Sequence, residues 1–149
     1  MRHVLRGMLA GAAGTSALNI VTYLDMTLRA RPASQTPEQS VDRLAGKLHV
    51  TLGDEQAAAN RRAGLGPLLG YATGLGAAAL YAVVASERPR WATAVGALTA
   101  AAMIGSNMPL TLLKVTDPRT WSATDWASDV IPHLAYGAVA ATTYRALRA

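Results

Sequence analysis

Two long uncharged runs constrain the fold of this chain more than any other feature. Residues 64–86 and 91–113 each contain 23 residues without an acidic or basic side chain. A helix rises about 1.5 Å per residue, so each run reaches roughly 35 Å, enough to cross a hydrocarbon layer about 30 Å thick. Charged residues make up 15% of the chain, whereas soluble domains carry roughly 25%. The two runs therefore predict transmembrane helices.

Two further segments complete the predicted bundle. Residues 7–24 are uncharged, and no A-x-A cleavage pattern follows them, so an uncleaved span is preferred to a signal peptide. Residues 130–144 give a shorter run, and a span there must start near Asp125, where SATD (122–125) is a helix-start pattern. The prediction is an all-α, four-helix transmembrane bundle in one domain, with spans at about 4–28, 64–86, 91–113 and 125–146.

The polar stretch 29–63 is predicted to lie outside the membrane, between the first two spans. Within it, TPEQ (36–39) has the pattern of a capping box with Pro at the first helical position, and apolar residues follow at helical spacing. This pattern predicts an amphipathic helix along the membrane surface. GDEQAAANRR (53–62) predicts a second helix start that leads into the second span, and SERPR (86–90) predicts a tight turn.

The distribution of basic residues predicts the topology. Four spans place 25–63 and 114–124 on one side, here called the loop face, with eight Lys/Arg and six acids in 50 residues. The opposite side, formed by 1–6, 86–90 and 145–149, has six Lys/Arg and one acid in 16 residues. The denser cations predict a multi-pass protein of the cytoplasmic membrane with both termini in the cytoplasm. The net charge of +5 is therefore assigned to topology, and the expected partners are the lipid bilayer and either a second copy or a larger membrane complex, with no nucleic acid.

Polar side chains recur at one depth of the predicted bundle. Helical rise puts Asn19, Asn107 and His133 roughly 9–12 Å below the loop face, with Asp129 just above them. One interpretation is that these groups satisfy one another and fix the helix register. The other is a water-filled cavity, open to the loop face, that binds a ligand or handles protons. The spacing of Asp129 and His133 lets the two side chains meet on one helix face.

Several neighbouring residues enter the same predictions. Asp25 and Tyr136 complete the set of candidate cavity residues. Arg61 or Arg62 is expected to form an ion pair with Asp25 or Asp129, the alternative being simple extension of the two arginines to the membrane interface.

Glycines four residues apart mark the expected helix contacts, since small residues allow helices to approach closely in lipid. Gly70 is shared by two such pairs and is expected at the closest contact. The first interpretation is packing within the bundle, and the second is a homodimer face. The glycines concerned are Gly7, Gly11, Gly66, Gly70 and Gly74.

The sequence lacks the residue patterns of the common catalytic and metal-binding sites. The chain has no Cys, which excludes disulfides, zinc-thiolate sites and cysteine nucleophiles. No Ser-His-Asp order, HExxH or paired-acid motif is present, and His133 has no second His at ligand spacing. We therefore expect no catalytic residue, no metal and no cofactor.

The C-terminal third resembles the YagU-like family of small bacterial inner-membrane proteins. NMPL (107–110), a turn with Pro118, the segment TDWASD (124–129) and Pro132-His133 carry the resemblance, although that family has Gly where Pro132 stands. The chain as a whole resembles membrane proteins common in high-GC actinobacteria, in the runs TYLDM, NRRAGLGPL and TDPRTWS. The YagU-like resemblance implies a link with acid tolerance.

Three classes of function remain open at this point. The leading one is a non-enzymatic structural or accessory bundle of the cell envelope, with a role in acid-stress tolerance. The second is a small transporter or proton-handling protein that uses Asp129 and His133. The third is an enzyme or a cofactor-binding membrane subunit.

Overall fold

A computed structural model describes residues 2–85 and 89–148, and these residues are all-α. The predicted end of the second span at residue 86 and most of the predicted turn 86–90 lie outside the described residues. The described helices, in chain order, are α1 (Arg2–Arg29), α2 (Thr36–Leu48), α3 (Glu55–Val84), α4 (Trp91–Leu112), the 3-10 helix η1 (Pro118–Thr120) and α5 (Ala123–Ala146).

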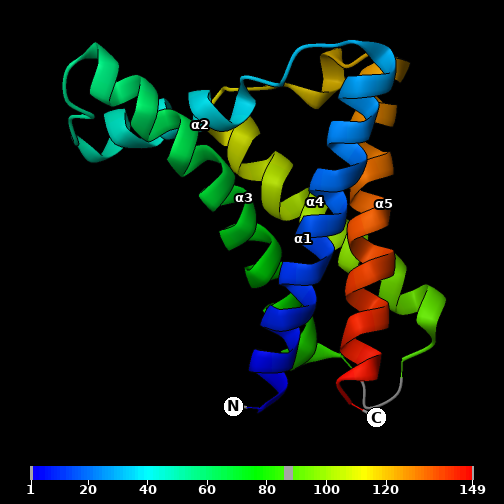
Figure 1. Cartoon of the computed structure of the whole chain (residues 1–149). Coiled ribbons are helices and arrows are strands. Elements are labelled where there is room, and N and C mark those ends of the chain that lie inside the picture. Colours follow the sequence, from blue (N-terminus) through cyan, green and yellow to red (C-terminus); the bar gives the residue numbers. More distant parts are fainter. Residues whose placement is uncertain (1, 86–88, 149) are drawn as a thin grey trace.

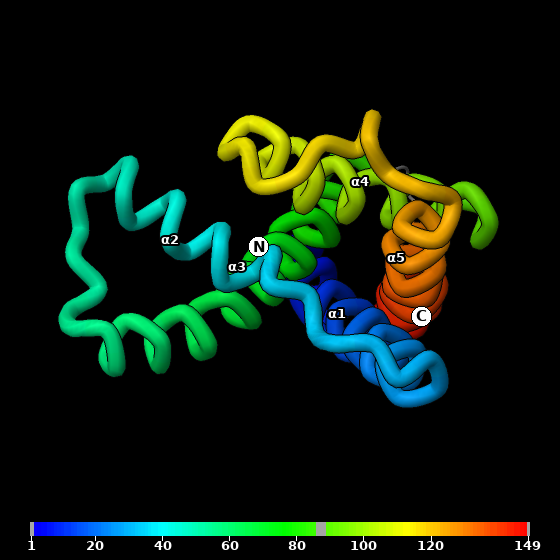
Figure 2. The backbone as a smooth tube through the Cα atoms, turned by 90° about the horizontal axis from the view of Figure 1, so that it is seen from above, coloured from blue at the N-terminus to red at the C-terminus, as the bar shows by residue number. Residues whose placement is uncertain are grey.

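Four of the helices, α1, α3, α4 and α5, pack into one bundle (Figure 1). Helix α1 packs against α3 and α5, and α4 packs against the same two helices from the other side. Seen from above, α3, α4, α5 and α1 surround a common interior (Figure 2). Helix α1 begins and α5 ends at the same end of the bundle.

Local capping explains two of the helix starts. The helix start predicted at SATD is confirmed, and Ser122 caps α5 in a capping box with Asp125. The Asp54 side chain accepts a hydrogen bond from the Ala57 amide and caps α3, so the predicted start near 53–62 is also confirmed. The capping box predicted at TPEQ is wrong. Gln35 precedes α2 without a side-chain cap, and the Thr36 amide donates instead to the Ser34 hydroxyl.

Helix α2 and the first turns of α3 form an arm that projects sideways from the bundle (Figures 1 and 2). Helix α2 packs against α3, and Val41 is buried in that contact while Leu48 at its end is exposed. Gly66 lies in the same contact, because an added methyl group would be 2.9 Å from Pro37. Gly66 therefore allows α2 to pack closely against α3 in the arm. It is not a contact between two of the predicted spans.

The half of the bundle nearer the chain termini is closely packed around glycine. A methyl group on Gly11 would lie 2.6 Å from the carbonyl oxygen of Gly74, and one on Gly7 would lie 2.6 Å from the carbonyl oxygen of Ala78. The backbones of α1 and α3 therefore touch here, and no side chain fits between them. An added methyl group on Gly70 would meet nothing within 4 Å. The expectation for Gly70 is corrected, since the closest contact lies one turn later, at Gly74.

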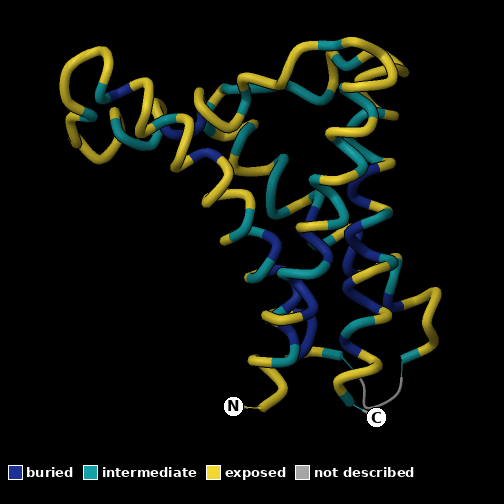
Figure 3. Tube along the Cα trace, in the orientation of Figure 1, coloured by how far each residue is buried: buried dark blue, intermediate teal, exposed yellow. Residues whose placement is uncertain are grey.

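Alanine and tyrosine fill the interior of this half, and Figure 3 shows most of the buried positions there. The Tyr136 ring lies against Gly14, and its hydroxyl donates to the carbonyl oxygen of Gly74 over 2.6 Å. The buried cluster consists of Ala10, Ala77, Ala78, Tyr81, Ala82, Ala94, Leu98, Ala102, Tyr136, Ala140, Ala141 and Tyr144.

Prolines mark the other half of the bundle, next to the loop face. Pro67, Pro109 and Pro132 lie inside α3, α4 and α5, and each helix continues through its proline. A proline lacks the amide hydrogen that would bond the carbonyl four residues earlier, and its ring presses on that carbonyl. Two cavities lie in this half, and Pro67 and Pro132 line one each.

Three helices, α1, α3 and α4, are long and apolar enough to cross a membrane. Helix α5, which carries Asp125, Asp129, His133 and Arg145, is not among them. Within the described residues, the chain therefore has three helices with the length and composition of transmembrane helices.

The contact at Gly11 leads to a stability prediction. We expect Gly11→Ala to destabilise the bundle by about 1–3 kcal/mol, because backbone atoms of α3 cannot yield to a methyl group. Gly70→Ala is the matched control, and we expect it to leave stability unchanged or raise it by up to about 1 kcal/mol through helix propensity. Unfolding in mixed detergent micelles, followed by circular dichroism, measures both. Equal losses for the two variants would contradict the assigned contact.

Candidate functional site

A polar cluster joins α4 and α5 at the depth expected from the sequence. The Asn107 side-chain amide donates to an Asp129 carboxylate oxygen over 3.0 Å. The other oxygen of Asp129 lies 3.5 Å from Nδ1 of His133. Both side chains are largely covered, with 18% of Asp129 and 11% of His133 exposed. Asp129 and His133 therefore turn inward and meet, as their spacing predicts.

The hydrogen-bond partners of His133 indicate which ring nitrogen carries a hydrogen. Its Nδ1 lies 2.7 Å from the backbone carbonyl oxygen of Asp129. A carbonyl oxygen can only accept, so Nδ1 carries a hydrogen. On the other side of the ring, Nε2 lies 3.3 Å from the Ser106 hydroxyl. That hydroxyl is also within 3.0 Å of the Ala102 carbonyl oxygen, so it has a second acceptor within reach.

An outer cavity of about 480 Å³ opens beside this cluster at the loop face. Its wall combines the end of α1, the segment after it, the start of α2, the end of α4 and the first turns of α5. The lining residues are Leu18, Thr22, Arg29, Arg31, Ser34, Thr36, Pro37, Asn107, Leu110, Thr116, Trp121, Asp125, Ser128, Asp129, Pro132 and His133.

An inner cavity of about 180 Å³ lies deeper, among α1, α3, α4 and α5. Its lining residues are Thr15, Leu18, Asn19, Pro67, Gly70, Thr73, Gly74, Ala102, Ser106, His133 and Tyr136. Its volume equals that of roughly six waters. His133 and Leu18 line both cavities, so they form the boundary between them.

Asn19 and Tyr136 take different positions among the predicted cavity residues. Both line the inner cavity, but Tyr136 is 1% exposed and its hydroxyl is bonded to Gly74. The Asn19 side chain has no hydrogen-bond partner among residues 2–85 and 89–148, although sequence reasoning placed it in one layer with Asn107 and His133. Asn19 therefore faces Ser106 and His133 across the inner cavity without a direct bond to them.

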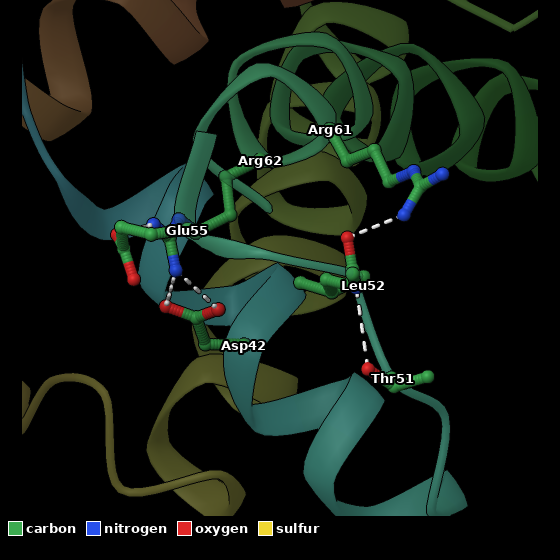
Figure 4. A network of polar contacts seen from close by, with 7 residues as sticks. Asp42, Thr51, Leu52, Glu55, Arg61 and Arg62 are labelled. Carbon is green, nitrogen blue, oxygen red and sulfur yellow. Dashed lines mark hydrogen bonds and ion pairs between the residues drawn. The ribbon is translucent and has the colours of Figure 1, made fainter. Parts of the chain in front are cut away.

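The predicted pairing of Arg61 or Arg62 with Asp25 or Asp129 is wrong. Arg62 pairs with Asp42 of α2 at 3.2 Å and with Glu55 at 2.9 Å (Figure 4). Arg61 donates to the backbone oxygen of Leu52 (Figure 4). The reason is that the first turns of α3 lie in the projecting arm, away from α1 and α5. Arg61 and Arg62 therefore bond to residues of the arm and stabilise it.

Asp25 instead pairs with the two arginines that follow it. Its carboxylate lies 2.5 Å from Nε of Arg31 and 3.5 Å from Nε of Arg29. Arg29 also donates to the Ser128 hydroxyl over 3.2 Å and so connects the end of α1 to α5. Asp25 is not part of the cavity wall. It positions the cations that are.

The loop between α4 and α5 is held by its own ion pair. Arg119 donates to both carboxylate oxygens of Asp117, at 3.0 and 2.9 Å. These side-chain hydrogen bonds, together with one from the Arg119 amide, hold the pKa of Asp117 below its ordinary value. Trp121 and Trp126 pack edge to face after this turn, with ring centroids 5.0 Å apart.

Sequence reasoning missed several residues of the site. Ser106 directly precedes Asn107, and its position next to a predicted layer residue could have drawn attention to it. Arg31 and Ser128 gave no such signal, because their roles depend on the path of the chain after α1. Within the part of the chain that the structure describes, no group of three His, Asp or Glu side chains could hold a metal ion.

Comparison of the chain with models of known protein families, with curated proteins and with solved structures gives no match.

The bond between Asn107 and Asp129 can be measured directly. We expect Asn107→Ala and Asp129→Ala each to lower stability, and the double variant to cost about 0.5–2 kcal/mol less than the sum, because the two residues share one interhelical bond. Asn19→Ala is the control at similar depth, and we expect it to change stability little. Strictly additive losses at 107 and 129, measured by unfolding in detergent, would show that the bond contributes nothing.

Proposed function

We propose that this chain is a four-span protein of the cytoplasmic membrane that takes up and releases protons at Asp129 and His133 from its loop face. In this proposal the protein is not an enzyme. It is an accessory protein of the cell envelope with a role in acid tolerance. The observation that carries the proposal is the position of His133, which bounds both cavities while it contacts Asp129 on one side and Ser106 on the other.

The hydrogen-bond pattern allows His133 to change charge without movement of heavy atoms. In the neutral ring Nε2 is an acceptor, and the Ser106 hydroxyl donates to it. In the protonated ring Nε2 donates to Ser106, whose hydrogen then turns to the carbonyl oxygen of Ala102. The Asp129 carboxylate, 3.5 Å from Nδ1, stabilises the positive charge of the protonated imidazole. A buried imidazole with satisfied partners in both states suits repeated proton uptake.

Other charged groups around His133 belong to this equilibrium. Asp125 lines the outer cavity from α5, and Arg29 and Arg31 line it from the end of α1 and the segment that follows. Helix α4 contributes the uncharged Asn107 and Ser106, and α3 contributes no charged residue to either cavity wall. The inner cavity holds one further titratable group, Tyr136, whose hydroxyl is bonded to Gly74. Asp129 is therefore the charge that contacts the imidazole directly.

The exposed side of α5 supports a fourth span. Its large outward residues, Ile131, Leu134 and Val139, are apolar and 38–56% exposed. Its charges at positions 125 and 129 turn to the outer cavity. A helix with an apolar exterior and a polar interior face meets the demands of lipid on one side and of a wet cavity on the other.

A structural accessory role is the second candidate, and one observation favours it. Asn107, Asp129, His133 and Ser106 satisfy one another across α4 and α5. Such bonds fix helix register whether or not protons move. The two candidates differ in whether the imidazole titrates.

Nitrogen-15 NMR of histidine-labelled protein in lipid nanodiscs tests the proposal. We expect neutral His133 to carry its hydrogen on Nδ1, unlike the exposed His3 and His49, and to bind a second proton reversibly within the pH range in which the bundle stays folded. His133→Gln assigns the signal, and Ser106→Ala removes the acceptor of the protonated Nε2. A His133 signal that does not change over this range would refute proton handling and leave the structural role.

The proposed topology has its own test, because the chain contains no Cys. We expect an impermeant maleimide to label Gln39→Cys, on the exposed side of α2, in intact cells. Ala146→Cys at the exposed end of α5 is the matched control, and we expect it to react only after permeabilisation. The reverse pattern would invert the orientation, and labelling of both positions in intact cells would contradict an even number of spans.

A further inference from the structure

Side chains of both charges line the outer cavity, and Arg29 connects the two sets through its hydrogen bond to Ser128 of α5. Arg29 and Arg31 contribute positive charge from the end of α1 and the segment after it, whereas Asp125 and Asp129 contribute negative charge from α5. Two cations and two anions line the cavity, and Asp25 contacts both cations from outside its wall. A cavity with this arrangement does not favour a simple anion or a simple cation, since either one meets repulsion from half of the wall.

The positive wall is prepared for an oxyanion. Asp25 contacts Arg29 and Arg31 through Nε of each guanidinium. Nη1 of Arg29 donates to Ser128, and Nη1 of Arg31 donates to the Pro32 carbonyl oxygen. Within residues 2–85 and 89–148, Nη2 of both arginines has no partner. Two positioned guanidinium groups with free donors match the oxygens of a phosphate or carboxylate.

The negative wall has one carboxylate with spare acceptor capacity. Asp125 is occupied in the capping box with Ser122. Asp129 accepts one hydrogen bond, from Asn107, while the Nδ1 hydrogen of His133 is directed at a backbone oxygen. A carboxylate can accept about four hydrogen bonds. Asp129 is therefore the group that would receive an ammonium ion.

We propose that the outer cavity binds a zwitterion that carries a primary ammonium group and an oxyanion in one molecule, with the oxyanion at Arg29 and Arg31 and the ammonium at Asp129. The cavity volume of about 480 Å³ lies within the range of roughly 300–1,000 Å³ that small-molecule sites occupy. This inference rests on the proposed function, because it names the ligand of the same cavity.

Two sources supply this chemistry, and both are consistent with the position of the cavity at the loop face. One is a free zwitterion from the aqueous side, such as an amino acid or phosphoethanolamine. The other is the phosphoethanolamine headgroup of a membrane lipid. Leu18, Leu110 and Trp121 add apolar surface to the same wall, which either ligand can contact.

Calorimetry with O-phosphoethanolamine as the probe tests the inference on the full chain in phosphatidylglycerol nanodiscs. We expect this probe to bind at least about tenfold more tightly than ethanolamine or inorganic phosphate, because each of these loses one charged hydrogen-bonded contact. Arg31→Gln and Asp129→Asn should each remove about tenfold in affinity, with Arg31→Lys intermediate. Arg119→Gln is the control outside the cavity wall, since Arg119 is 88% exposed and pairs with Asp117.

The lipid composition distinguishes the two sources. If the headgroup occupies the cavity, phosphatidylethanolamine in the nanodisc will compete with the soluble probe, and Arg31→Gln will relieve the competition. If the ligand is a free zwitterion, probe affinity will not depend on the lipid. Equal affinity for phosphate and phosphoethanolamine, or no binding of either in phosphatidylglycerol, would overturn the inference. The His133 titration is measured without ligand, so proton handling can fail or survive independently.

Discussion

The contact between the backbones of α1 and α3 is the constraint on which the rest of the structure depends. Gly11 meets the carbonyl of Gly74 where no side chain could fit, and the same carbonyl accepts the hydrogen bond of the Tyr136 hydroxyl. Three helices are therefore joined at one point, since Tyr136 belongs to α5. Lipid provides no hydrophobic force between helices, so close approach and shared hydrogen bonds must hold them together. This point fixes the floor of the inner cavity, which Gly74 and Tyr136 both line.

The two halves of the bundle follow from different residue types. Glycine and alanine let the half near the termini close, whereas Pro67, Pro109 and Pro132 interrupt hydrogen bonding near the loop face. Polar side chains line the two cavities of this second half. Pro67 borders the inner cavity and Pro132 the outer one.

The sequence predicts much of the fold because its signals are local. Uncharged runs and the capping patterns at Asp54 and Ser122 identify the helices and their starts. The inward pairing of Asp129 with His133 was also predictable, since it follows from spacing on one helix. Contacts that depend on the path between helices were not. The sideways projection of the arm decided the partners of Arg61 and Arg62, and the choice of Gly74 over Gly70 depended on the rotation of α3, which equal four-residue spacing leaves open.

The position of the charges argues for a protein that acts at one face. Arg29, Arg31, Asp125 and Asp129 all line the outer cavity, and His133 stands at its inner boundary. Beyond the inner cavity, the half near the termini is filled by the alanine and tyrosine cluster. In the proposed function, a proton or a ligand that reaches His133 from the loop face therefore also leaves by the loop face, because closely packed residues lie behind the inner cavity.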